Sequence, residues 1–122
     1  MNKPLVLAVE DNADTLSSLR LSLSQEGFHV VTVSDGEAAL RVLESLKPDL
    51  ILTDLMMPKL NGVDMIKELK SRQTLSGIPV IVVSAFLDEY GEAAVQAGAT
   101  VVLRKPQEMA SLIETINRAV GR

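Results

Sequence analysis

Side chains capable of chemistry follow the apolar runs of this sequence. Asp54 stands where the run Leu50–Thr53 ends. Four further groups end other apolar runs in the same way: Glu10, Asp11, Ser84 and Lys105. A carboxylate at the end of a buried strand is costly unless other groups pair with it. We therefore expect the four groups to meet Asp54 in one site.

The chemistry of this set favours phosphoryl transfer. Three neighbouring carboxylates repel one another, and a hard divalent cation with oxygen ligands removes that conflict. Mg²⁺ is held by one or two carboxylates and also reaches phosphate oxygens. Lys105 adds a positive charge that suits phosphate, and Ser84 adds a hydroxyl donor. The set indicates transfer of a phosphoryl group onto the carboxylate of Asp54.

Ten alternating segments must position these side chains. Five continuous apolar runs are typical of strands buried on both faces. They are Leu5–Val9, Val30–Val33, Leu50–Thr53, Val80–Val83 and Val101–Leu103. Helical spacing follows each run, which predicts an α/β fold with a doubly wound, five-stranded parallel sheet and five helices on its two faces. The flavodoxin-like strand order 2-1-3-4-5 would bring the polar strand ends together.

Glycine and proline predict where the helices end. Gly27 is expected to cap the first helix, and Pro48 to end the second helical segment. The fourth helix is predicted over residues 88–97, with Gly98 as its stop. Lys70, in the third helix, is expected to point outward.

Composition narrows the class of protein. The chain has 122 residues, so we expect a single domain over residues 1–122. A net charge of -4 argues against a nucleic-acid or anionic-membrane partner, and the absence of cysteine excludes disulfides and thiolate metal sites. No apolar run approaches the roughly 18 residues of a membrane span. We expect a cytoplasmic protein without direct nucleic-acid or membrane contacts.

Five motifs in order resemble the receiver domain of two-component response regulators, in particular the single-domain chemotaxis regulators. The motifs are Glu10-Asp11, Asp54 with Met57-Pro58 and Gly62 downstream, Ser84-Ala85, Gly98-Ala99 and Lys105-Pro106. The resemblance covers the whole chain. It implies a phosphorylation-activated signalling switch that assists its own Mg²⁺-dependent phosphorylation and dephosphorylation, and not an enzyme with an external substrate.

The resemblance also implies a role for each residue. Asp54 would be the phospho-acceptor, Ser84 the switch hydroxyl and Lys105 the lysine that contacts the phosphoryl group. The bond between Lys105 and Pro106 would be cis. The Mg²⁺ ligands would be the side chains of Glu10, Asp11 and Asp54 and the backbone carbonyl of Met56.

Partners follow from the same resemblance. A histidine kinase or histidine phosphotransfer protein would donate the phosphoryl group. An output protein would bind the face made by the fourth helix, the fifth strand and the fifth helix, unless the chain is a receiver excised from a larger protein. Two alternatives stay open: a phosphorylation-independent interaction module, and a phosphatase that uses an aspartyl-phosphate. Met56 stands where such a phosphatase would need its second acid.

Val102 departs from the family pattern, because many receivers place Tyr or Phe three residues before the lysine. Valine cannot make the large rotamer change of a ring, so we predict a muted response on the output face. Amide NMR shifts, measured with and without a phosphoryl mimic, should then show large changes confined to the loops. Shifts spread over residues 88–97 and 107–120 would contradict this prediction.

Overall fold

Five parallel strands form the centre of the structure. The computed structural model describes residues 3–57 and 59–122. The strands are β1 (Leu5–Val9), β2 (His29–Val33), β3 (Leu50–Thr53), β4 (Val80–Ser84) and β5 (Val101–Arg104). They pair in parallel in the order β2-β1-β3-β4-β5, which confirms the predicted topology.

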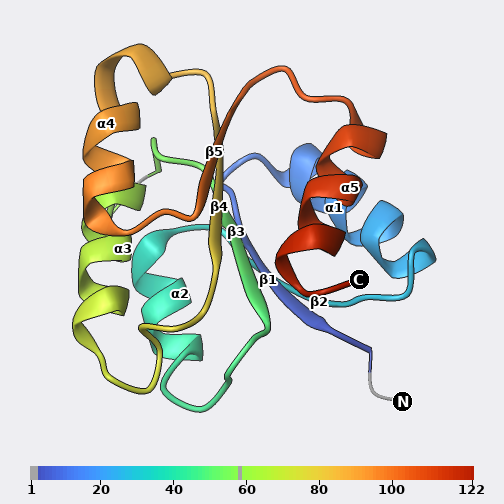
Figure 1. Cartoon of the computed structure of the whole chain (residues 1–122), viewed down its shortest axis with the longest axis horizontal. Helices are drawn as coiled ribbons and strands as arrows, with labels where there is room; N and C mark the ends of the chain where they lie inside the picture. Colours follow the sequence, from blue (N-terminus) through green and yellow to red (C-terminus); the bar gives the residue numbers. More distant parts are fainter. Residues whose placement is uncertain (1–2, 58) are drawn as a thin grey trace.

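Helices cover both faces of the sheet. They are α1 (Ala13–Gln25), α2 (Gly36–Val42), α3 (Gly62–Ser71), α4 (Leu87–Ala97) and α5 (Met109–Ala119). Figure 1 shows α1 and α5 on one face and α2, α3 and α4 on the other. The predicted α/β, doubly wound architecture is therefore confirmed.

The sheet separates two apolar clusters, and successive residues of a strand point into opposite ones. In β1, Leu7 and Val9 pack with the α2, α3 and α4 side, whereas Val6 and Ala8 pack with the α1 and α5 side. All four side chains are at most 1% exposed. Because both faces of the strand are buried, the sequence shows a continuous apolar run where a half-exposed strand would alternate.

Glycines end α1 and α4 as predicted. Gly27 has a φ of 87°, and its N–H donates to the carbonyl of Ser24 (3.2 Å), while Phe28 N–H donates to Leu23 (3.0 Å). These two bonds form a Schellman motif, which satisfies carbonyls left free at a helix end. Gly98, with a φ of 121°, ends α4.

The end predicted for α2 was wrong. The helix stops at Val42 and does not continue to Pro48. After it, Glu44 N–H donates to Arg41 (3.2 Å) and Ser45 N–H to Val42 (3.2 Å). Such bonds across three residues tighten the last turn and leave the α-helical path before proline is reached.

The outward orientation predicted for Lys70 was also wrong. Its Nζ folds back and donates to the carbonyls of Ser76 (2.9 Å) and Ile78 (2.7 Å). The methylene stem lies against Gly98, where an added Cβ would be 2.8 Å from Lys70 Cγ. Burial lowers the pKa of Lys70. This side chain joins α3 to the segment before β4 and to the end of α4.

The Lys70 contacts predict a loss of stability on substitution. Lys70→Met keeps the stem but leaves two carbonyls without their donor, so the free energy of unfolding should fall by about 1–2 kcal/mol. Urea denaturation would measure the change. Lys67→Met is the matched control, because Lys67 lies exposed on the same helix. Equal stability of the two variants would contradict a structural role for the Lys70 ammonium.

Candidate functional site

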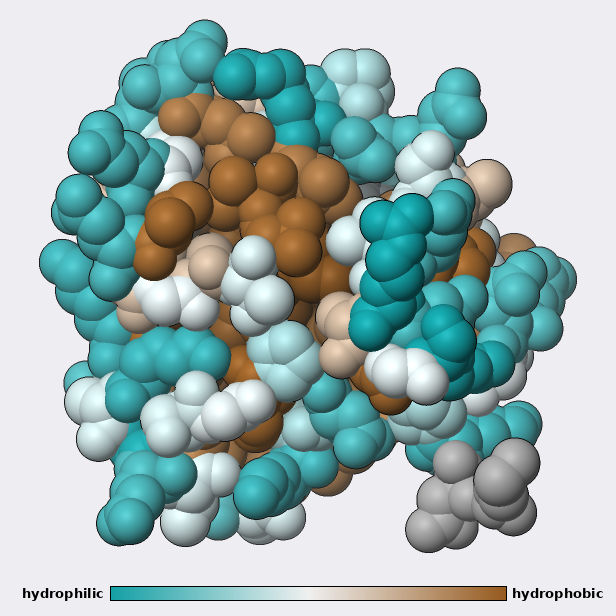
Figure 2. All heavy atoms as spheres, in the orientation of Figure 1, coloured by the Kyte–Doolittle hydropathy of each residue, from teal (hydrophilic) through white to brown (hydrophobic). Residues whose placement is uncertain are grey.

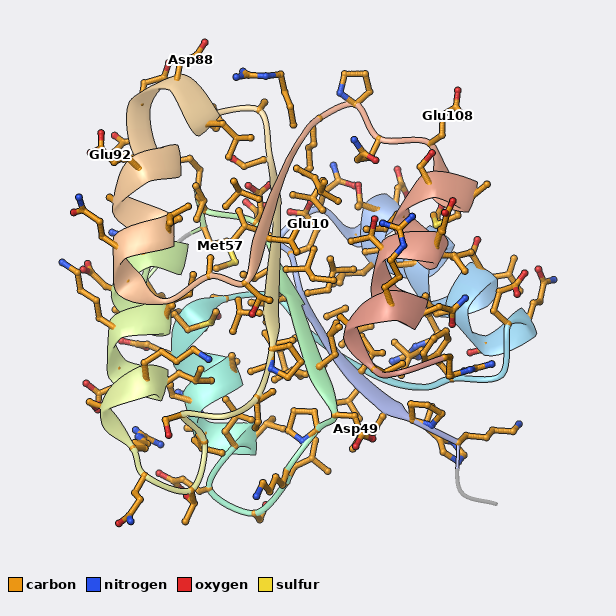
Figure 3. The ribbon with its side chains drawn as sticks, in the orientation of Figure 1. Glu10, Asp49, Met57, Asp88, Glu92 and Glu108 are labelled. Atoms are coloured by element: carbon orange, nitrogen blue, oxygen red, sulfur yellow. The ribbon has the colours of Figure 1, made fainter. Side chains whose placement is uncertain are left out.

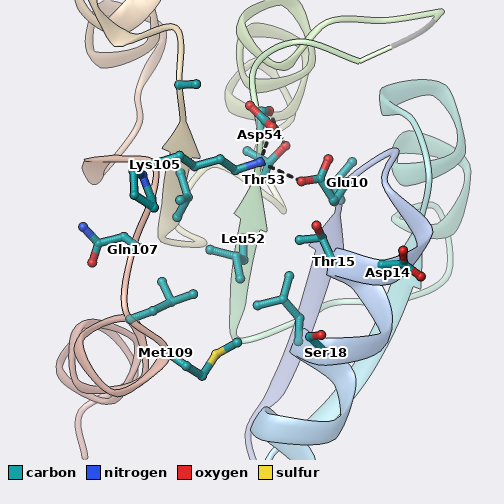
Figure 4. Close-up of a pocket in the computed structure, with 16 residues that line it drawn as sticks. Glu10, Asp14, Thr15, Ser18, Leu52, Thr53, Asp54, Lys105, Gln107 and Met109 are labelled. Atoms are coloured by element: carbon teal, nitrogen blue, oxygen red, sulfur yellow. Dashed lines mark hydrogen bonds and ion pairs between the residues drawn. The ribbon is translucent and has the colours of Figure 1, made fainter.

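Three charged side chains meet at the carboxyl ends of the strands. Lys105 Nζ donates to Glu10 Oε1 (2.8 Å) and to Asp54 Oδ2 (2.7 Å). Figure 4 shows the ammonium between the two carboxylates. The site therefore contains a lysine shared by two acids from different strand ends.

Strand register explains why these residues meet. Val9 of β1 pairs with Thr53 of β3, so the residues that follow, Glu10 and Asp54, leave neighbouring strands at the same level. Asp54 N–H continues the ladder by donating to the carbonyl of Val9 (3.2 Å). On the other side, Lys105 N–H donates to the carbonyl of Ser84 at the end of β4 (3.0 Å). The sheet backbone thus aligns the three charged residues.

Burial makes the shared ammonium important. Glu10 is only 5% exposed, and Figure 3 shows it near the middle of the molecule, whereas Asp88 and Glu108 lie at its periphery. Burial disfavours the charge on Lys105, but hydrogen bonds and charges from Asp54 and Glu10 outweigh this effect and raise its pKa above the ordinary 10.5. Lys105 is therefore positively charged at neutral pH.

Asp54 is held by the chain that follows it. Its Oδ1 accepts from Leu55 N–H (2.6 Å). Gly62 N–H donates to the carbonyl of Leu55 (2.8 Å), so the start of α3 returns to the end of β3. A Cβ at Gly62 would collide with the carbonyl oxygen of Asp54, so only glycine allows this close approach.

The structure brings together part of the predicted site. Ser84 is fully buried, and its Oγ accepts from Phe86 N–H (3.0 Å). Asp11 is exposed, and the Met56 side chain lies at the surface. Within residues 3–57 and 59–122, no hydrogen bond joins Asp54 to Asp11 or Ser84. Pro58, part of one predicted motif, lies outside the described residues, while the predicted cis bond between Lys105 and Pro106 is confirmed.

The donor set fits Mg²⁺ in chemical type. Glu10 and Asp54 present carboxylate oxygens to one positive charge, the Lys105 ammonium. Hard oxygen donors of this kind, together with water, are those that Mg²⁺ prefers. In the described part of the chain, no group of three or more His, Cys, Asp or Glu side chains is arranged around a common point.

Two residues near the site are not among those predicted from the sequence. Asn12 caps α1, because its Oδ1 accepts from Thr15 N–H (2.9 Å); an Asn directly before a helical pattern is the signal for such a cap. Gln107 lines a groove beside Lys105. No sequence pattern marks that groove, since its walls come from segments far apart in the chain.

Comparison with known proteins agrees with this geometry. The family model of the response regulator receiver domain matches residues 6–117. The chain belongs to this family. Receiver domains act as signalling domains of two-component systems, and they are not classical enzymes.

Relatives and solved structures are similar over most of this receiver domain. It is 36% identical over 107 residues to the alkaline phosphatase synthesis transcriptional regulatory protein PhoP of Bacillus subtilis, covering 87% of this chain and 43% of PhoP. The chain spans about half the length of the curated relatives it matches.

Two solved structures share its fold closely. The receiver domain of the Pseudomonas aeruginosa sensor histidine kinase PA1611, with a magnesium ion coordinated in its active site cleft, is 30% identical with a TM-score of 0.91, covering 98% of this chain and 99% of that one. Chemotaxis response regulator CheY4 of Vibrio cholerae is 26% identical with a TM-score of 0.90, covering 97% of this chain and 99% of CheY4.

Within the described residues of this receiver domain, no helix is both long and apolar enough to span a bilayer.

The shared ammonium predicts a pH-dependent contribution to stability. Lys105→Met should lower the free energy of unfolding by about 1–2 kcal/mol at pH 7, because Glu10 and Asp54 lose their common partner in a partly screened site. The pKa of Lys105 is raised by folding, so its contribution is complete below pH 10.5 and is lost as pH rises through the raised value.

Chemical denaturation from pH 7 to pH 11.5 or so would measure this dependence. The surface variant Lys67→Met serves as the control. A deficit in Lys105→Met that stays constant over the whole range would show that the lost contribution is packing and not charge.

Proposed function

We propose that Asp54 accepts a phosphoryl group from a histidine kinase or histidine phosphotransfer protein. The domain, taken as residues 1–122, would then act as a phosphorylation-activated switch. The observation that carries this proposal is the Lys105 ammonium, held 2.7 Å from Asp54 Oδ2 at the carboxyl edge of the sheet. A lysine in this position can pair first with the carboxylate of Asp54 and then with the oxygens of the transferred phosphoryl group.

The reaction needs a carboxylate nucleophile and charge neutralisation. An Asp54 oxygen would attack phosphorus while the bond from phosphorus to the donor imidazole nitrogen breaks, and that nitrogen keeps the electron pair. Lys105 would pair with the phosphoryl oxygens. When bound, Mg²⁺ would neutralise charge on the carboxylates and the phosphoryl group. Its ligands would be Glu10, Asp11, Asp54 and the Met56 carbonyl.

Ser84 supports a switching role. Its hydroxyl accepts from Phe86 N–H, and α4 begins at the next residue, Leu87. A phosphoryl group on Asp54 would offer new acceptors to the Ser84 hydroxyl, so its reorientation would act directly on the start of α4.

Output would then use the face of α4, β5 and α5. Figure 2 shows apolar atoms gathered over β5 and the adjoining part of α4. Tyr90 and Val95 of α4 are 42% and 53% exposed, and Phe86, just before α4, is 43% exposed. Val102 packs half-buried against the core on the α2, α3 and α4 side.

The muted response predicted for the Val102 position stays a prediction. The cytoplasmic location and the absence of nucleic-acid and membrane partners also stay predictions.

The main alternative is a protein-interaction module that works without phosphorylation. The exposed apolar face suits either function, so the chemistry at Asp54 must distinguish them. The phosphatase alternative would need a general acid two positions after Asp54. Met56 occupies that position, and its thioether cannot serve as a general acid.

Intact-mass measurement after incubation with Mg²⁺ and acetyl phosphate tests the proposal. We expect one phosphoryl adduct that requires Mg²⁺ and is absent in Asp54→Asn. Asp64→Asn, which alters an exposed aspartate of α3, should label like the parent protein. Multiple turnover of the donor would favour the phosphatase. If neither acetyl phosphate nor a phosphorylated phosphotransfer protein gives an adduct, the result would favour the phosphorylation-independent interaction module.

The same assay tests the metal ligands. Glu10→Gln should raise the Mg²⁺ concentration needed for half-maximal labelling by about tenfold or more, since a buried ligand is lost. Asp14→Asn, an exposed carboxylate nearby on α1, should leave that concentration unchanged. Equal shifts in both variants would indicate a general charge effect without direct coordination by Glu10.

A further inference from the structure

A groove between α1 and α5 extends away from the candidate phosphoryl site and shares Glu10, Asp54 and Lys105 with it. Its volume is about 660 Å³, and it opens beside Lys105 at the carboxyl end of the sheet. Figure 4 shows Thr15 and Ser18 of α1 on one side, with Gln107 and Met109 on the other. Volumes between about 300 and 1,000 Å³ are typical of sites for small molecules.

The floor of the groove is apolar. Leu52 of β3, Leu19 of α1 and Leu112 of α5 all line it, and each is buried to 93% or more of its surface. These residues belong to the apolar cluster between the sheet and the α1 and α5 helices. A flat hydrocarbon group would therefore find contacts on three sides, from the sheet and from both helices.

One end of the groove is strongly polar and carries excess negative charge. Glu10, Asp14 and Asp54 line it, against the single ammonium of Lys105, so these four groups sum to -2 (1 - 3). Lys105 uses Oε1 of Glu10, while the nearest donor to Oε2 is the N–H of Asn12 at 3.4 Å. The second oxygen of this buried carboxylate therefore accepts only a long, weak hydrogen bond.

We propose that the groove binds a small amphipathic cation. The apolar part of the ligand would lie over Leu52 and Leu112, and its ammonium or amidinium group would lie at the acidic end beside Glu10. A neutral molecule of the same shape would gain only the apolar contacts, and an anion would also meet the excess negative charge. This inference does not depend on phosphorylation of Asp54, but the ligand and Mg²⁺ would compete for Glu10.

Three matched probes test the charge preference. They are 2-phenylethylamine, 2-phenylethanol and 3-phenylpropanoate, which are cationic, neutral and anionic at pH 7. Amide NMR titration of the full chain should show saturable shifts near Thr15, Ser18 and Gln107 with the amine. For a fragment of this size we expect a Kd of roughly 1 mM or lower. The alcohol should bind about tenfold more weakly, and the anion weaker still.

Two neighbouring serines of α1 provide matched variants. Ser18→Phe would fill the groove and should weaken amine binding by about tenfold or more, whereas Ser17→Phe, exposed and outside the groove lining, should not. The same spectra report whether each variant is folded. The proposal is wrong if the amine gives no saturable shift, if the alcohol binds as tightly, or if the shifts lie on α4. The comparison of the three probes uses the parent protein, so it tests the proposal even if Ser18→Phe does not fold.

Discussion

The Lys105 ammonium, held between Glu10 and Asp54, is the interaction on which the site depends. In the chain, Lys105 lies 95 residues from Glu10 and 51 residues from Asp54. Two carboxylates this close would repel each other in a largely buried position without a positive charge between them. The ammonium supplies that charge, and hydrogen bonds and charges from both acids raise the pKa of Lys105.

The same ion pairs connect the chemistry with the fold. Each partner leaves the sheet at the carboxyl end of a parallel strand, where ligands bind in open α/β sheets. The close return of Gly62 fixes the backbone at Asp54, the proposed nucleophile, and the N–H of Leu55 orients the Oδ1 oxygen of Asp54. Metal binding, phosphoryl transfer and the proposed groove ligand would all draw on Glu10, so charge at this residue links the three.

The backbone between the candidate site and α4 is short. Ser84, Ala85 and Phe86 lead directly from the end of β4 to α4, and Ser84 already bonds the backbone of Phe86. At the far end of α4, the Lys70 stem packs on Gly98. Helix α4 therefore contacts different parts of the fold at its two ends, and β5 beside it carries Val102 and no aromatic ring at that position.

Much of this receiver domain was determined by the sequence alone. Strands buried on both faces must be continuously apolar, so Leu5–Val9 and Leu50–Thr53 were predicted to the residue, and the acids at their ends marked the site. Local patterns could not reveal that Lys70 turns inward, because its acceptors, the carbonyls of Ser76 and Ile78, come close only after folding. The spacing of α1 and α5 likewise depends on how both helices pack on the sheet. Only the tertiary structure therefore decided that a groove lies between them and opens onto the buried carboxylates.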